Sequence, residues 1–196
     1  MAREKKFGKP PCIFKIDISP EKYEILLNYF ENSIFKEMSY FYFDTDLNQE
    51  KAQFLNANIR LRLRTRIGRY NLELKNKMVF PLIEFSQNLS PMQLRSIFRG
   101  EVPNGIICQQ LLELGFSDKI LWLGCTRTVR VKRNFYDGIL VLDKTIHVFK
   151  TCYSIEFRSY QALPRSKILF LKRELKINPV DNYFTSKLRH VWLSKL

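Results

Sequence analysis

The sequence predicts an α+β fold, a closed eight-stranded antiparallel β-barrel (a tunnel) with helices packed outside it. Two observations support this prediction. Several segments alternate between apolar and charged residues, and in a strand such alternation puts each kind on its own face. Capped segments of helical period lie between them. A sheet with one charged and one apolar face buries both if it closes around a lumen and is covered by helices.

The first predicted elements are a strand, a helix and a second strand. Residues 14–18 are typical of a short strand. The Ser-Pro-Glu sequence at residues 19–21 predicts a helix start, because Ser caps the first turn and Pro and Glu are favoured within it. The helix is expected to continue to about Phe30. Residues 39–45 are rich in Tyr and Phe, which predicts the next strand.

Residues 59–67 alternate between apolar and basic side chains. The expected apolar face carries Ile59, Leu61, Leu63 and Ile67, and the expected charged face carries Arg60, Arg62, Arg64 and Arg66. A turn at Gly68-Arg69 and a return strand at residues 70–75, with Glu73 and Lys75 polar, complete a predicted hairpin. Four like charges in one row repel each other, which favours an anionic guest beside them. Alternation alone is equally consistent with an open sheet whose charged face lies in water.

The rest of the chain continues this mixture of strands and helices. Strands are predicted at residues 80–86, 126–133, 139–144 and 153–158, and helices at 92–98, 105–114, 166–175 and 185–195. Ser90 is the expected N-cap of the first of these helices, and Gly115 is expected to end the second. A turn at residues 136–138 makes a second hairpin. We expect residues 1–11 to be a basic flexible arm and residues 12–196 a single domain.

The charge balance predicts affinity for polyanions. The formal net charge is +14, which suits nucleic acid, anionic lipid or small polyphosphates. No stretch reaches the roughly 18 uncharged apolar residues that a membrane span needs. With only His147 and His190, a zinc site or a histidine-based triad is not expected. Four cysteines without metal-type spacing predict free thiols in a reducing, cytoplasmic compartment: Cys12, Cys108, Cys125 and Cys152.

The order of the segments is similar to that of a known superfamily. SPEKYEILLNYF, YFDT, RLRLR with GRYNLELK, LIEFSQ, LDKT, YSIEF and SKLRH follow one another from about Phe14 to Leu196. This series resembles the CYTH superfamily, the triphosphate tunnel metalloenzymes, and within it the bacterial branch similar to thiamine and inorganic triphosphatases. The resemblance implies an eight-stranded tunnel in which basic residues bind a triphosphate and carboxylates hold divalent metal ions.

The resemblance also implies individual site residues. The phosphate-binding residues would be Lys15, Arg62, Arg64, Lys75, Arg130 and Lys187. The metal-binding carboxylates would be Glu84, Asp143 and Glu156. Three of the six family carboxylates are missing, because the ExExK motif of the first strand has become Pro11-Cys12-Ile13-Phe14-Lys15 and the last ExE pair has become Ser154-Ile155-Glu156. Bases alone can hold phosphate, whereas a hard cation needs several oxygen ligands.

We therefore expect a tunnel domain that binds a triphosphate or another phosphorylated polyanion, with weak, altered or absent catalysis. Mg²⁺ or Mn²⁺ would be weakly bound or brought by the ligand. Whether the protein is an enzyme stays open, because a working Mg²⁺- or Mn²⁺-dependent triphosphatase could recruit Asp17, Asp44 or Glu73. A second alternative is a nucleic-acid binder that uses the outer basic surface. A class IV adenylate cyclase is the weakest interpretation.

Overall fold

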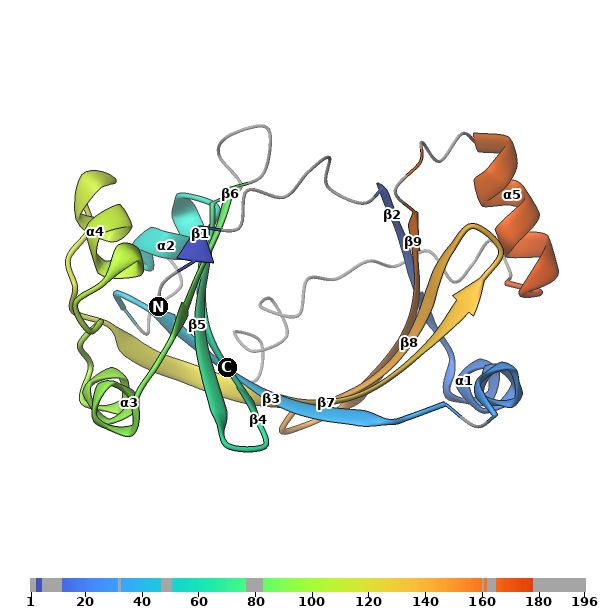
Figure 1. Ribbon diagram of the computed structural model, residues 1–196, viewed down its shortest axis with the longest axis horizontal. Coiled ribbons are helices and arrows are strands. Elements are labelled where there is room, and N and C mark those ends of the chain that lie inside the picture. The colour runs from blue at the N-terminus through green and yellow to red at the C-terminus, as the bar shows by residue number, and fades with distance from the viewer. Residues whose placement is uncertain are drawn as a thin grey trace. The chain divides into compact units, whose positions relative to one another are not determined.

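The computed structural model describes residues 3–4, 12–31, 33–46, 51–76, 83–159, 161 and 165–177 (Figure 1). They form two compact units. Unit 1 contains residues 3–4, 38–46, 51–76 and 83–126, and unit 2 contains residues 12–31, 33–37, 127–159, 161 and 165–177. The predicted helix at residues 185–195 and Lys187 lie outside the described residues.

The described strands form one sheet. They are β1 (Arg3–Glu4), β2 (Cys12–Ile18), β3 (Lys36–Asp44), β4 (Ile59–Arg66), β5 (Arg69–Asn76), β6 (Ile83–Asn88), β7 (Leu121–Phe135), β8 (Gly138–Ile146) and β9 (Thr151–Ser159). The order is β1-β6-β5-β4-β3-β7-β8-β9-β2. Apart from the two-residue β1, this is the eight-stranded antiparallel sheet that the sequence predicts. The order ends at β1 and β2, so hydrogen bonds between the described strands do not close it.

The hairpin of β4 and β5 largely follows the predicted alternation. Leu61 and Leu63 are fully buried, whereas the arginines that alternate with them, Arg60, Arg62 and Arg64, are only half-buried. The turn falls at Ile67-Gly68, where both residues have positive φ, as in a type I′ turn. The expectation that Ile67 continues the apolar face is wrong. Ile67 is 91% exposed because it occupies the turn and no longer follows the pleat of the strand.

Helices cover the apolar face of unit 1 (Figure 1). They are α2 (Gln53–Asn56), α3 (Pro91–Phe98) and α4 (Ile106–Glu113). As predicted, Ser90 caps α3, in a capping box with Gln93. Gly115, with φ of +81°, follows α4, and the next residue donates to Leu111 in a Schellman motif. The core joins Leu61, Leu74 and their neighbours on the strands to side chains of all three helices, namely Phe54, Ile97, Ile107 and Leu111.

Unit 2 contains α1 (Pro20–Leu27), a short 3₁₀ turn η1 (Asn28–Phe30) and α5 (Arg165–Glu174). Ser19 accepts a hydrogen bond from the Lys22 backbone and caps α1 as predicted. One core joins the two helices to the apolar face of β2, β7, β8 and β9, and it includes Leu26, Leu140, Ile155, Phe157 and Leu171. With the apolar face of each sheet segment covered, its polar side chains gather on the other face.

Three features were not predicted from the sequence. Strand β1, within the expected flexible arm, pairs with β6. Strand β7 begins at Leu121 instead of Thr126. Helix α2 follows a buried aspartate, Asp44, whose carboxylate accepts hydrogen bonds from the backbone amides of Phe54 and Leu55. Asp44 therefore organises backbone in unit 1, which makes it a poor candidate for a recruited metal ligand. No helix in the described part of the chain has the length and apolar character needed to cross a membrane.

Candidate functional site

The polar face of unit 1 is built from the pairing of β3, β4, β5 and β6. Arg62 pairs with Tyr42 on one side and Glu73 on the other, and Glu73 pairs in turn with Ser86. One pleat away, Arg60 pairs with Lys75, which pairs with Glu84. Directly paired residues point to the same face of a sheet. We call this set face 1: Tyr40, Tyr42, Arg60, Arg62, Arg64, Asn71, Glu73, Lys75, Glu84 and Ser86.

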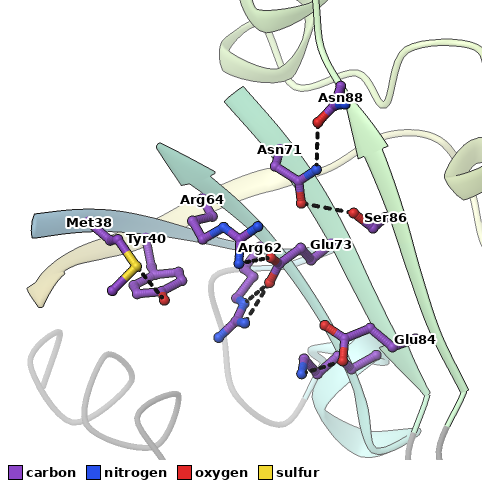
Figure 2. A network of polar contacts seen from close by, with 10 residues as sticks. Met38, Tyr40, Arg62, Arg64, Asn71, Glu73, Glu84, Ser86 and Asn88 are labelled. Carbon is purple, nitrogen blue, oxygen red and sulfur yellow. Dashed lines mark hydrogen bonds and ion pairs between the residues drawn. The ribbon is translucent and has the colours of Figure 1, made fainter. Parts of the chain in front are cut away.

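Glu73 is the organising residue of face 1 (Figure 2). Its carboxylate accepts a hydrogen bond of 2.6 Å from Arg62 Nε, and Arg62 Nη2 lies 2.5 Å from the same oxygen. The other oxygen lies 2.9 Å from Arg64 Nη1. The side chain of Glu73 is only 3% exposed, whereas that of Arg64 is 38% exposed. One buried carboxylate thus aligns two guanidinium groups and leaves face 1 with an excess of positive charge.

Tyrosines border this cluster. The guanidinium of Arg62 lies over the ring of Tyr40, 4.6 Å from its centre, which is a cation–π arrangement. Tyr40 in turn donates its hydroxyl to the sulfur of Met38 at 3.6 Å (Figure 2). Arg62 is therefore held by a carboxylate and by an aromatic ring, so its position is set before any ligand arrives.

The remaining bases of face 1 differ in their partners. Lys75 Nζ donates to Glu84 at 2.6 Å. Among the described residues Arg60 has no ion-pair partner, and its buried Nε has no hydrogen-bond partner. Burial, followed by the charge of Arg62, lowers the pKa of both Arg60 and Lys75. Burial alone would raise the pKa of Glu73, but Arg62 and Arg64 outweigh it and lower that pKa. Face 1 is therefore a crowded cationic surface around an ionised carboxylate.

The polar face of unit 2 is built on β7, β8, β9 and β2. Arg130 forms a two-pronged ion pair with Asp143, with both hydrogen bonds at 2.6 Å. Glu156 pairs with Arg158 on its own strand and lies opposite Lys15 of β2. Burial, followed by the nearby Arg158 and Arg130, lowers the pKa of Lys132. By their register these residues form face 2: Lys15, Asp17, Arg130, Lys132, Asp143, Ser154, Glu156 and Arg158.

The residues assigned from the resemblance therefore fall on two faces. Face 1 carries Arg62, Arg64, Lys75 and Glu84, and face 2 carries Lys15, Arg130, Asp143 and Glu156. Glu73 lies on the charged face as predicted, but its bonds to two arginines were not expected. An acidic residue placed two positions before Lys75, opposite the arginine row, is the signal that could have revealed this pairing.

Two of the positions that lack the family's carboxylates can be placed. Ser154 is 5% exposed and lies on face 2 between Asp143 and Asp17, each on a neighbouring strand. Ile13 is 56% exposed at the other end of β2. Pro11 lies outside the described residues. Ser154 therefore adds no charge to the middle of face 2, where the resemblance implies a glutamate.

The described residues do not fit a preformed metal cage. Glu84, Asp143 and Glu156 are each engaged by a base, namely Lys75, Arg130 and Arg158. Within the described ranges, no three or more His, Cys, Asp or Glu side chains cluster closely enough to hold a metal ion. A hard divalent cation needs several oxygen ligands at once. The described side chains can instead bind and orient phosphate oxygens through charge-assisted hydrogen bonds.

One curated relative shares sequence with this chain. It is a Bacillus subtilis protein called "Putative triphosphatase YjbK", 33% identical over 129 residues. The match covers 64% of this chain and 63% of YjbK, so the chain spans slightly less than two thirds of that relative. No protein-family model matches the sequence.

Solved structures share the fold. A protein from Bacillus halodurans described as a putative adenylate cyclase aligns with a TM-score of 0.80 at 21% identity, covering 93% of this chain and 97% of its own. A putative adenylyl cyclase from Hippeastrum, described as having a dominant triphosphatase activity, aligns with a TM-score of 0.75 at 21% identity, covering 95% and 97%. At this identity the alignments establish a shared architecture.

Proposed function

This chain belongs to the CYTH superfamily, and from that premise we propose that it binds a triphosphate-type anion. The observation that carries the proposal is the buried Glu73 carboxylate shared by Arg62 and Arg64. Two guanidinium groups fixed by one acid keep unused hydrogen-bond donors and a net positive charge, as a phosphate site requires. Preorganisation by Glu73 also lowers the entropy cost of binding.

The closed tunnel predicted from the sequence is part of this proposal. It rests on the resemblance, and it requires faces 1 and 2 to serve one ligand, together with Lys187 from outside the described residues. Binding measurements on variants of both faces can test the tunnel. If both faces hold the same triphosphate, Arg62→Ala and Arg130→Ala will each weaken binding of inorganic triphosphate, and saturation will occur at one ligand per chain. A second independent site would contradict the tunnel.

The direct test is calorimetry with inorganic triphosphate and with a short RNA, on the wild type and Arg62→Ala. We expect triphosphate binding in the wild type and a clear loss in the variant. A nucleic-acid binder would behave differently, because RNA would bind with a steep salt dependence and triphosphate would give little heat. Equal RNA affinity in both proteins, without triphosphate heat, would overturn the proposal.

Hydrolysis of the ligand is a second candidate function, favoured by the names of YjbK and the Hippeastrum protein. We propose that phosphate release is weak, because the described carboxylates are engaged by bases and three family carboxylates are missing. Release should be measured from inorganic triphosphate, thiamine triphosphate and ATP with Mg²⁺ and Mn²⁺. A turnover of about 1 per second or more would contradict weak catalysis. Combining Pro11→Glu, Ile13→Glu and Ser154→Glu should raise the rate if only the metal ligands are lacking.

A cytoplasmic location remains the expectation. Cys108 and Cys125 are in no disulfide, and unpaired thiols persist in reducing compartments.

A further inference from the structure

Two polar atoms on face 1 are buried without a hydrogen-bond partner among the described residues. They are the hydroxyl oxygen of Tyr42 and Nε of Arg60. The side chain of Tyr42 is fully buried. A buried polar group left unpaired costs about 1–3 kcal/mol, so such groups are rare in folded proteins and call for an explanation.

The two atoms belong to one region of face 1. Tyr42 pairs with Arg62 on β4, and Arg60 lies two residues before Arg62 on the same strand, so all three side chains share a face. The hydroxyl of Tyr42 is close enough to Arg60 to influence its pKa. A phenol oxygen can accept from a guanidinium, but Arg60 Nε and the Tyr42 hydroxyl form no such bond among the described residues. An anionic oxygen beside them would accept from both donors at once.

Arg60 also differs from the other bases of face 1. Arg62 and Arg64 share Glu73, and Lys75 binds Glu84, whereas Arg60 has no carboxylate partner in the described part of the chain. Burial and the neighbouring Arg62 lower the pKa of Arg60, which means that both disfavour its charged form. An anion beside Arg60 would favour that charged form.

We propose that Arg60 and Tyr42 form a subsite for an ionised phosphoryl group at one end of the ligand, beyond the phosphates held by Arg62 and Arg64. The inference rests on the proposed function and extends it. The oxygen of this group accepts from the Tyr42 hydroxyl and from the Arg60 guanidinium, which satisfies both donors. Arg60 thereby sets how long a phosphate chain the protein prefers.

Strand geometry gives the subsite a length dependence. Successive residues on one face of a strand are about 6.6 Å apart, so Arg60 and Arg64 leave the backbone about 13 Å apart. Inorganic triphosphate can contact both arginines more readily than pyrophosphate, which is one phosphate shorter. Loss of Arg60 should therefore penalise the longer ligand more.

The test compares Arg60→Gln and Tyr42→Phe with the wild type by calorimetry, with inorganic triphosphate and pyrophosphate as probes. Arg60→Gln should weaken triphosphate binding about 10-fold to 100-fold, and pyrophosphate binding by a smaller factor. Tyr42→Phe should weaken triphosphate binding about 5-fold. Without ligand, Tyr42→Phe should melt at the same or a higher temperature, because an unpaired buried hydroxyl is gone. Arg66→Gln, an exposed arginine in the same row, is the matched control and should bind like the wild type.

Each outcome is decisive. If the wild type binds triphosphate but Arg60→Gln and Tyr42→Phe bind it equally well, the subsite is wrong and the proposed function stands. If the wild type binds neither probe, the proposed function fails and the subsite with it. An equal loss for both probes would mean that Arg60 supplies general charge and no length-dependent contact, which also overturns the subsite. Should Arg60→Gln not fold, Tyr42→Phe decides, since it removes a single oxygen.

Discussion

Faces 1 and 2 are built in the same way but differ in their excess of positive charge. In both, a carboxylate on one strand meets an arginine directly opposite it on the next, as Glu73 meets Arg62 and Asp143 meets Arg130. Face 1 sets four bases against two acids: Arg60, Arg62, Arg64 and Lys75 against Glu73 and Glu84. Face 2 is nearly balanced, with Lys15, Arg130, Lys132 and Arg158 against Asp17, Asp143 and Glu156.

This difference in charge balance indicates which face binds an added anion more favourably. On face 2 Asp143 engages Arg130 with both oxygens, so a phosphate must compete with an ideal partner. On face 1 Glu73 binds two arginines, and Arg60 has no carboxylate partner in the part of the chain that the structure describes. A phosphate there adds contacts without displacing any of the described ones. We infer that face 1 supplies most of the binding energy, and the following variants challenge that inference.

The largest effect is expected at Glu73. Glu73→Ala leaves Arg62 and Arg64 without their buried carboxylate, and breaking a buried ion pair from one side costs about 3–5 kcal/mol. Inorganic triphosphate should restore part of this loss by taking the place of the carboxylate. Urea denaturation with and without triphosphate measures both effects. Glu84→Ala, whose side chain is more exposed, is the control and should lose less. Equal losses would show that Glu73 has no special role.

The second largest loss of stability is expected for Asp143→Ala. It orphans one arginine instead of two, so we expect a loss of about 3 kcal/mol in the free energy of unfolding. Triphosphate should rescue this variant less than Glu73→Ala, because face 2 has little cation excess. The same denaturation series provides the comparison. A stronger rescue at Asp143 would reverse the ranking of the two faces.

The next largest effect is expected on triphosphate binding, which should weaken more when face 1 loses an arginine than when face 2 does. Arg64→Ala should weaken triphosphate binding by about 1.5–3 kcal/mol, while stability without ligand should fall less than in Glu73→Ala, because Arg62 still pairs with the buried carboxylate. Arg158→Ala on face 2 should weaken binding by about 1 kcal/mol or less, since Arg158 is paired one-to-one with Glu156. Calorimetry on the two variants measures this, and a larger loss at Arg158 would contradict the inference.

The smallest effect is a dependence on pH. Arg62 and Arg64 overcome burial and hold the pKa of Glu73 below its ordinary value of 4.5. A carboxylate with a lowered folded pKa stabilises fully above the ordinary value, and the stabilisation is lost as the pH falls below 4.5 through the folded pKa. The stability difference between wild type and Glu73→Gln should therefore shrink in acid. A difference that widens in acid would mean that the carboxylate is not ionised in the folded protein.

Local patterns were enough to predict most of the sheet. Alternation placed Arg60, Arg62 and Arg64 on one face, and the caps at Ser19 and Ser90 marked two helix starts correctly. These features depend on neighbours in sequence, so they can be read from the chain itself. Ile67 was misplaced because apolar character outweighed its position in a tight turn.

Contacts between distant residues could not be predicted in the same way. The capping of α2 by Asp44 joins residues 10 and 11 positions apart, and the lack of a partner for the Tyr42 hydroxyl among the described residues depends on the side chains packed around it. The burial of Arg60 depends on how the neighbouring strands are paired with β4. The alternation of residues within β4 does not specify that register. Alternation therefore predicted which strand face carries the charged side chains, whereas their partners required the structure, and their role in binding stays a prediction.

The pairing of β2 with β9 has a consequence for synthesis of the chain. More than 130 residues separate Ile18 from Thr151, so the ribosome needs roughly 7 to 27 seconds after β2 to deliver its partner. During that interval β2 is an unsatisfied strand, and such strands recruit other chains. Lys15 and Asp17 place charges within it, which discourages sticking between nascent chains. We therefore expect Lys15, proposed to bind phosphate in the finished protein, also to protect the unfinished one.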